Sequence, residues 1–114
     1  MPSKNIMIYY DLLRKVYKEA DKKSLVYIPY SERDYWSGTL NKFNMNFFSQ
    51  AISERPSLYG GVGGTYYLLE NYQEIFKKNK KDYTEKELLE EAKKLGFKFI
   101  YCIKDKKLKK IDIN

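Results

Sequence analysis

Residues 84–114, TEKELLEEAKKLGFKFIYCIKDKKLKKIDIN, carry the clearest local signals of secondary structure in the chain. The first part of this stretch predicts a helix, because Thr84 and Glu87 have the spacing of a capping box and Gly96 is a typical C-terminal stop. Residues 97–103 are rich in aromatic and β-branched side chains and predict a strand, which the turn KDKK connects to a second strand over 108–114. Alternation along the first strand places Cys102 on one face and four larger side chains on the other: Phe97, Phe99, Tyr101 and Ile103.

Outward from this stretch, toward the N-terminus, the sequence predicts three more helices and one short strand. Apolar residues at helical spacing indicate helices over 4–20, over 40–52 after a cap at Thr39, and over 66–78. The run LVYIP (25–29) predicts a strand that Pro29 ends or places at a sheet edge. Residues 1–114 are therefore expected to form a single α+β domain with about four helices, a short strand and a C-terminal β-hairpin.

This order of elements resembles the winged-helix fold, in which helices and a short strand precede a hairpin wing. The resemblance covers most of the chain and rests on element order alone. It implies that the helix over 84–95 would be the recognition helix. That helix carries four acids, which would repel phosphates, so the sequence argues against DNA reading by this helix. The acids are Glu85, Glu87, Glu90 and Glu91.

The composition argues against catalysis and against a bound metal. The chain has no histidine and one cysteine, so it lacks a Ser-His or Cys-His pair and the usual zinc ligands. We expect a non-enzymatic protein without a cofactor, in which Cys102 is an inert core residue. Glu32 and Asp34 could hold a magnesium ion, but a pair of acids in a loop is more typical of a solvated loop.

Hydropathy and net charge bear on location and partner. No apolar run approaches the roughly 20 residues of a membrane span, and charged residues interrupt the N-terminal apolar positions, so neither a span nor a signal peptide is expected. A cytoplasmic protein is the simplest interpretation. The net charge of +7 favours an acidic partner, either nucleic acid or an acidic protein or nucleoprotein complex. The alternative is that the lysines only provide solubility.

Two lysine clusters are the candidate nucleic-acid contacts. The hairpin lysines could form one stripe along its outer face, or they could instead protect a sheet edge from pairing. Arginine, the usual reader of bases, occurs only three times, which favours contact with the phosphate backbone without sequence preference. The hairpin cluster is Lys98, Lys104, Lys106, Lys107, Lys109 and Lys110, and the second cluster is Lys77, Lys78, Lys80 and Lys81.

The stretch SLYGGVGGTYY (57–67) contains four of the six glycines. It fails the P-loop pattern because no lysine precedes Thr65, and it fails the dinucleotide pattern because residue 66 is tyrosine. A hinge between helices is one interpretation. The other is an anion site formed by Gly63, Gly64 and Thr65 at the start of the 66–78 helix, which could take a phosphorylated small molecule.

Aromatic side chains in predicted loops are candidate partner-binding anchors, or else they cover a small core. They are Tyr30, Tyr35, Trp36 and Tyr59. Together these features predict a small basic binding protein that acts on nucleic acid or on a nucleic-acid-handling complex. Such chains are frequent in phages and mobile elements. The alternative is a protein inhibitor of a host defence nuclease complex, similar in role to anti-CRISPR proteins, that binds through the aromatic loops.

Overall fold

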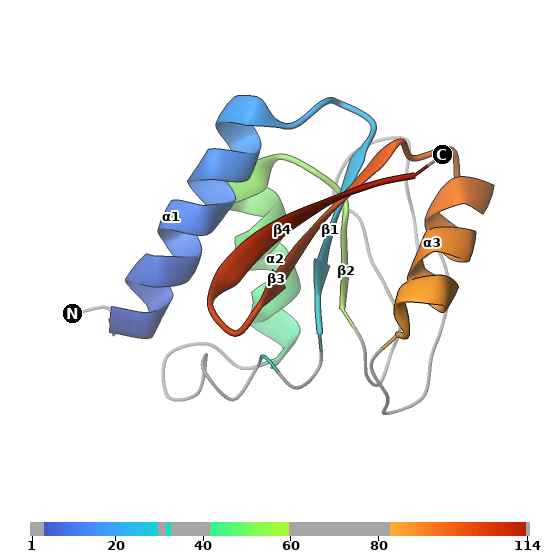
Figure 1. The fold of residues 1–114 in the computed structure, drawn as a ribbon. Helices are drawn as coiled ribbons and strands as arrows, with labels where there is room; N and C mark the ends of the chain where they lie inside the picture. Colours follow the sequence, from blue (N-terminus) through green and yellow to red (C-terminus); the bar gives the residue numbers. More distant parts are fainter. Residues whose placement is uncertain (1–3, 30–31, 33–41, 60–82, 114) are drawn as a thin grey trace.

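The computed structural model describes residues 4–29, 32, 42–59 and 83–113 of the chain (Figure 1). These residues form three helices and four strands. In chain order they are α1 (Lys4–Glu19), β1 (Ser24–Ile28), α2 (Lys42–Ser53), β2 (Ser57–Tyr59), α3 (Glu85–Lys94), β3 (Phe99–Lys104) and β4 (Lys107–Asp112). The α+β class is thus confirmed. The helix expected over 66–78 lies outside the described residues.

The four strands form one mixed sheet in the order β2-β1-β3-β4. The short strand β1 pairs in parallel with β2 on one side and with β3 on the other, and β3 pairs antiparallel with β4. The expected winged-helix-like order is therefore not confirmed, because the hairpin continues a sheet whose centre is parallel.

The position of β1 decides between the two alternatives for Pro29: the strand is central in the sheet, and Pro29 ends it. Pro29 follows the last strand residue, Ile28, so its missing N–H removes no bond from the β1 ladder. All five residues of β1 are buried, as is typical of a strand that is covered on both faces. The three-residue strand β2 was expected to be loop, and it pairs with β1 through Val26–Ser57 and the next two positions.

Helices cover both faces of the sheet. On one face, α1 and α2 pack over Val26, Ile28 and Tyr101 (Figure 1). On the other face, α3 packs over Leu25 and Ile100, which point the opposite way from their neighbours in the same strands. The core is therefore divided into two apolar layers by the sheet. Within the described residues, no helix is long and apolar enough to cross a membrane.

The capping signals of α3 are confirmed. The Glu87 amide donates to the Thr84 hydroxyl at 3.1 Å, and the Thr84 amide donates to the Glu87 carboxylate at 2.9 Å. Gly96 has a φ of +87°, a left-handed conformation that a side chain would strain. These local features fix where α3 begins and ends.

The hairpin is also confirmed, with one correction to its faces. Phe99, Tyr101 and Ile103 pack on the α1 side, and Cys102 points to the α3 side. Phe97 was expected to share the face of Phe99, but it precedes β3 and packs in the α3-side core instead. Alternation applies only within the strand, and β3 begins at Phe99.

Arg55 joins the ends of two helices. Its guanidinium donates to the carbonyls of Ala20 at 2.8 Å and Asp21 at 3.1 Å, just beyond α1. It also donates to the carbonyls of Ser53 and Glu54 at the end of α2, at 3.3 and 3.0 Å. Helix C-terminal carbonyls carry partial negative charge, so one cation stabilises both ends.

Candidate functional site

The β3–β4 turn is held by a buried carboxylate. Glu32 is 1% exposed, and it accepts hydrogen bonds from the backbone amides of Asp105 at 2.8 Å and Lys106 at 2.9 Å. The Tyr9 hydroxyl on α1 donates to the same carboxylate at 2.5 Å. We call these three contacts the Glu32 clasp. The expectation of a solvated acid is therefore wrong for Glu32, whereas Asp34 lies outside the described residues.

The clasp depends on the unusual backbone of the turn. Asp105 and Lys106 have φ values of 54° and 60°, the left-handed conformation of a two-residue hairpin turn. Both amides then point to the same side, where they form a small concavity that favours a negative charge. Glu32 supplies that charge from the segment between β1 and α2, so it fixes the hairpin end relative to α1.

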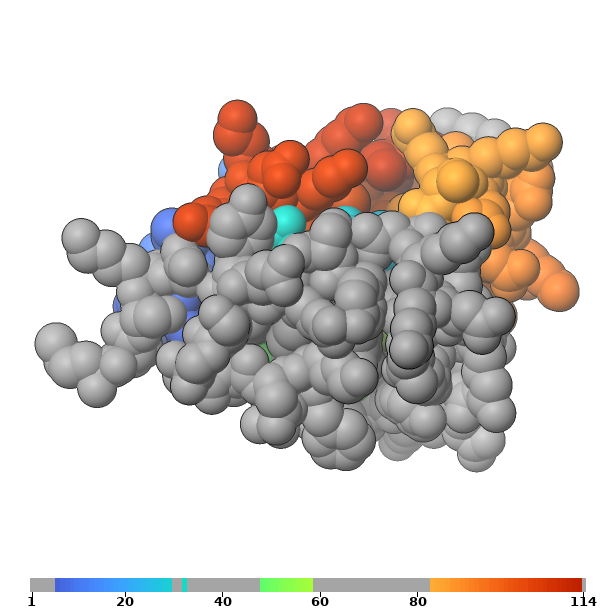
Figure 2. Space-filling model, turned by 90° about the horizontal axis from the view of Figure 1, so that it is seen from below, coloured from blue at the N-terminus to red at the C-terminus, as the bar shows by residue number. Residues whose placement is uncertain are grey.

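The hairpin separates its lysines onto two faces. Lys104 and Lys107 are paired across the strands, and Lys109 is paired with Cys102, which places all three on the α3 side of the sheet. Their side chains are exposed. Lys106 lies at the turn and is partly buried. The hairpin end and the start of α3 lie on the same side of the molecule (Figure 2).

The other two hairpin lysines lie apart from this group. Lys110 is paired with Tyr101 and so points to the α1 side, where its ammonium lies 4.4 Å from the centre of the Phe99 ring. Lys98 precedes β3, six residues before Lys104, which is about 20 Å along an extended strand. The expected single stripe of six lysines is therefore wrong, because a strand alternates its side chains between faces.

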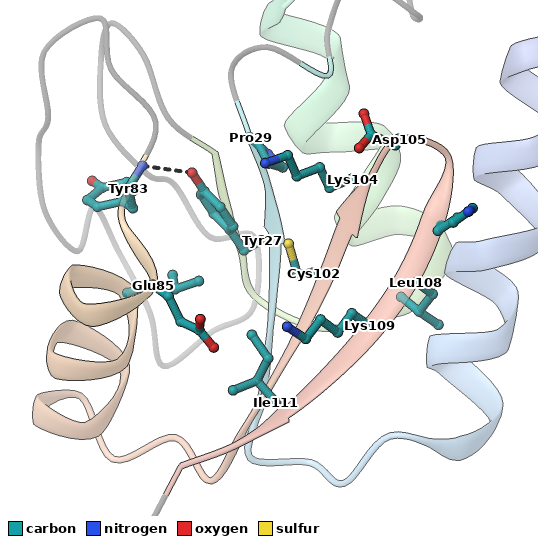
Figure 3. A pocket seen from close by; sticks show the side chains of 12 residues that line it. Tyr27, Pro29, Tyr83, Glu85, Cys102, Lys104, Asp105, Leu108, Lys109 and Ile111 are labelled. Atoms are coloured by element: carbon teal, nitrogen blue, oxygen red, sulfur yellow. Dashed lines mark hydrogen bonds between the residues drawn. The ribbon is translucent and has the colours of Figure 1, made fainter.

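The lysines on the α3 side line a groove of about 500 Å³ (Figure 3). The groove lies over the C-terminal parts of β1 and β3, between the hairpin and the start of α3. In sheets with parallel strands, the carboxyl ends of the strands are a preferred location for ligands. The lining residues are Tyr27, Pro29, Tyr83, Glu85, Leu88, Cys102, Lys104, Asp105, Lys107, Leu108, Lys109 and Ile111.

One end of the groove is a rigid pair of tyrosines. The Tyr83 amide donates to the Tyr27 hydroxyl at 2.9 Å, and the two rings meet edge to face with centroids 5.8 Å apart. Tyr27 is 3% exposed and Tyr83 is 9% exposed. Burial raises the pKa of the Tyr83 phenol, and the nearby Glu91 and Glu87 raise this pKa further. These rings form a wall, and their faces are not available for a ligand to stack on.

The charge of the groove is uneven. Three lysines come from the hairpin and face Glu85 at the start of α3, and Asp105 lies at the turn. In Figure 3, the side chains of Lys104 and Lys109 extend from their strands toward Pro29 and Glu85. Between these charges, the floor is formed by Cys102, Ile111 and Leu88. The groove thus combines a cationic wall with an apolar floor, which suits an anion that also carries an apolar group.

Of the remaining predicted site residues, all but Tyr59 lie outside the described part of the chain. For Tyr59, the structure gives the backbone, which pairs with Ile28, and not the side chain. The others are Lys77, Lys78, Lys80, Lys81, Tyr30, Tyr35, Trp36, Gly63, Gly64 and Thr65. Among residues 4–29, 32, 42–59 and 83–113, no group of three or more acids or cysteines is placed to hold a metal ion.

Neither the groove nor the Glu32 clasp is evident from the amino-acid sequence. Tyr27 on β1 lies beside Cys102 on β3 only because these distant strands pair in parallel, and the hairpin then adds Ile111 on β4. The one available signal was alternation within KDKKLKK, which separates Lys107 and Lys109 from Lys110. Comparison with known proteins adds no assignment: no protein-family model matches the chain, and no curated protein or solved structure is significantly similar to it.

Proposed function

We propose that this chain is a cytoplasmic, non-enzymatic protein that binds the phosphate backbone of nucleic acid through the groove-side lysines, which are Lys104, Lys107 and Lys109. The observation that supports this is their convergence on one face of the hairpin, beside a groove and away from Lys98 and Lys110. Three cations on paired strands concentrate positive charge on one face of the hairpin. Such an array neutralises phosphates and releases their counterions.

The chemistry of the array favours binding without sequence preference. Lysine ammonium groups are point charges that contact phosphates, whereas bidentate arginine contacts usually read bases. The Glu32 clasp restrains the hairpin that carries the lysines, so less conformational freedom is lost when a partner binds. An acidic protein surface could bind the same three lysines. The test therefore uses nucleic acid without any bound protein.

The proposal is tested by neutralising the groove-side lysines in a matched comparison. One variant carries Lys104→Gln, Lys107→Gln and Lys109→Gln. The control carries Lys15→Gln, Lys18→Gln and Lys22→Gln, three exposed lysines on and just after α1. Each variant has a net charge of +4, three below the +7 of the original chain, so overall charge is the same in both.

Affinity for a labelled oligonucleotide is then measured by fluorescence anisotropy at several salt concentrations. The groove variant should lose most of its affinity, and its log–log salt slope should fall by about 2 to 3, which corresponds to three lost phosphate contacts. The control should retain its slope. If both variants lose affinity equally, the array has no special role. If the unaltered chain binds no nucleic acid, the proposal is wrong, and an acidic protein surface becomes the candidate partner.

A further inference from the structure

The groove beside Lys104, Lys107 and Lys109 is concave. Its shape determines whether a single strand or a duplex can reach its floor. A duplex presents a convex outer surface of phosphates, and its bases are stacked inside. Such a surface can touch the rim of the groove but cannot reach its floor. A single strand has unstacked bases that can enter a cavity.

We infer that the groove takes one unpaired nucleotide of a single strand, and that the protein therefore prefers single strands to duplex. This inference rests on the proposed function. The volume of about 500 Å³ falls within the range of pockets that hold small organic ligands, so a nucleotide-sized group has room. The lining supplies both surfaces that a nucleotide needs, which are cations for the phosphate and apolar atoms for the base.

The charges set the orientation of the nucleotide. The phosphate lies against the lysines of the hairpin wall, because Glu85 on the opposite wall would repel it. The base then lies over Cys102 and Ile111, which are partly buried in the α3-side layer and keep part of their surface toward the groove. The base does not stack on Tyr27, whose ring is buried in the end wall.

The two modes of binding predict opposite preferences. Lysines that act only as surface charge would favour the duplex, because the duplex has the higher density of phosphates and releases more counterions. A groove that takes a base favours the single strand. The test therefore compares one labelled oligonucleotide, single-stranded and annealed to its complement, at the same salt concentration. We expect the single strand to bind at least about fivefold more tightly, because the base buries apolar surface against the floor of the groove.

A variant that fills the floor tests the location. Cys102→Phe adds volume in the groove and changes no charge. In this variant, the affinities for single strand and duplex should differ by no more than about twofold. Cys102→Val, a small apolar replacement, should keep the preference for the single strand. Glu85→Gln removes the repulsive acid and should strengthen single-strand binding in the same assay.

The outcomes separate this inference from the proposed function. Equal or tighter binding of the duplex by the unaltered chain overturns the inference and leaves the proposed function intact. A preference that survives Cys102→Phe, in a variant with an unchanged circular dichroism spectrum, also overturns it. Because the preference of the unaltered chain is measured first, the inference can fail even if the Cys102→Phe variant does not fold. Absence of binding to both forms overturns both proposals.

Discussion

The Glu32 clasp gives a stability prediction that can be worked from its contacts. A hydrogen bond to a charged group contributes about 1.5–3 kcal/mol. The Tyr9 contact is buried, and the contacts to the Asp105 and Lys106 amides are partly buried, so water can replace some of the latter two. Glu32→Gln keeps the shape of the side chain, removes the charge and turns one acceptor into a donor. We expect the free energy of unfolding to fall by about 2 kcal/mol.

The fall is large compared with the stability of a domain of this size. Domains are stable by about 5–15 kcal/mol, and urea m-values are about 1–3 kcal/mol per molar. The urea midpoint, measured by circular dichroism, should therefore fall by about 0.7–2 M. Glu90→Gln on the exposed face of α3 is the control, and its effect should stay within about 0.5 kcal/mol.

Hydrogen exchange locates the effect. In Glu32→Gln the amides of Asp105 and Lys106 should lose protection before the amides in the middle of β3 do. Tyr9→Phe should destabilise by about 1 kcal/mol alone and by less in the Glu32→Gln background, because the two residues share one contact. If Glu32→Gln and Glu90→Gln have equal urea midpoints, the clasp does not stabilise the hairpin.

Three further predictions concern the scaffold. Arg55→Lys should lower the free energy of unfolding by about 1–2 kcal/mol in urea, because an ammonium cannot donate to four carbonyls of two helix ends at once. An unchanged midpoint would mean that the Arg55 contacts between α1 and α2 do not stabilise the fold. Thr84→Ala should cost about 1 kcal/mol in the same assay through loss of the α3 cap, and Thr84→Ser should restore most of it. The raised pKa of Tyr83 means that the folded chain keeps this phenolic proton above about pH 10, where the unfolded chain releases it. The urea midpoint of the unaltered chain should fall as pH rises past 10, and that of Tyr83→Phe should fall less steeply. If the two midpoints fall in parallel with pH, the Tyr83 phenol does not contribute to the loss of stability.

The elements with local signals were predictable from the sequence, and those that depend on distant pairing were not. Thr84, Glu87 and Gly96 define α3 within thirteen residues, and the turn before Lys107 defines the hairpin. β2 has only three residues, too few for a periodic pattern, and it exists because β1 lies beside it. Pairing across long separations carries no local signature.

The site was predictable in its residue types and not in its geometry. Lysines on the hairpin indicated contact with phosphates, but the division between Lys109 and Lys110 follows from strand alternation, which the expected stripe ignored. Glu32 resembled a solvated acid because its partners are backbone amides more than 70 residues away, which a sequence does not display. The groove likewise needs β1, β3 and α3 in place.

The central position of β1 has a consequence for synthesis of the chain. Val26 pairs with Tyr101, 75 residues later, so the middle of the sheet cannot close until β3 has left the ribosome. At about 5–20 residues per second, the delay is about 4–15 s. During that time the apolar strand Ser24–Ile28 has neither its β3 neighbour nor the α3 side of its core. We expect this segment to be the main binding point for chaperones on the nascent chain until β3 has been synthesised.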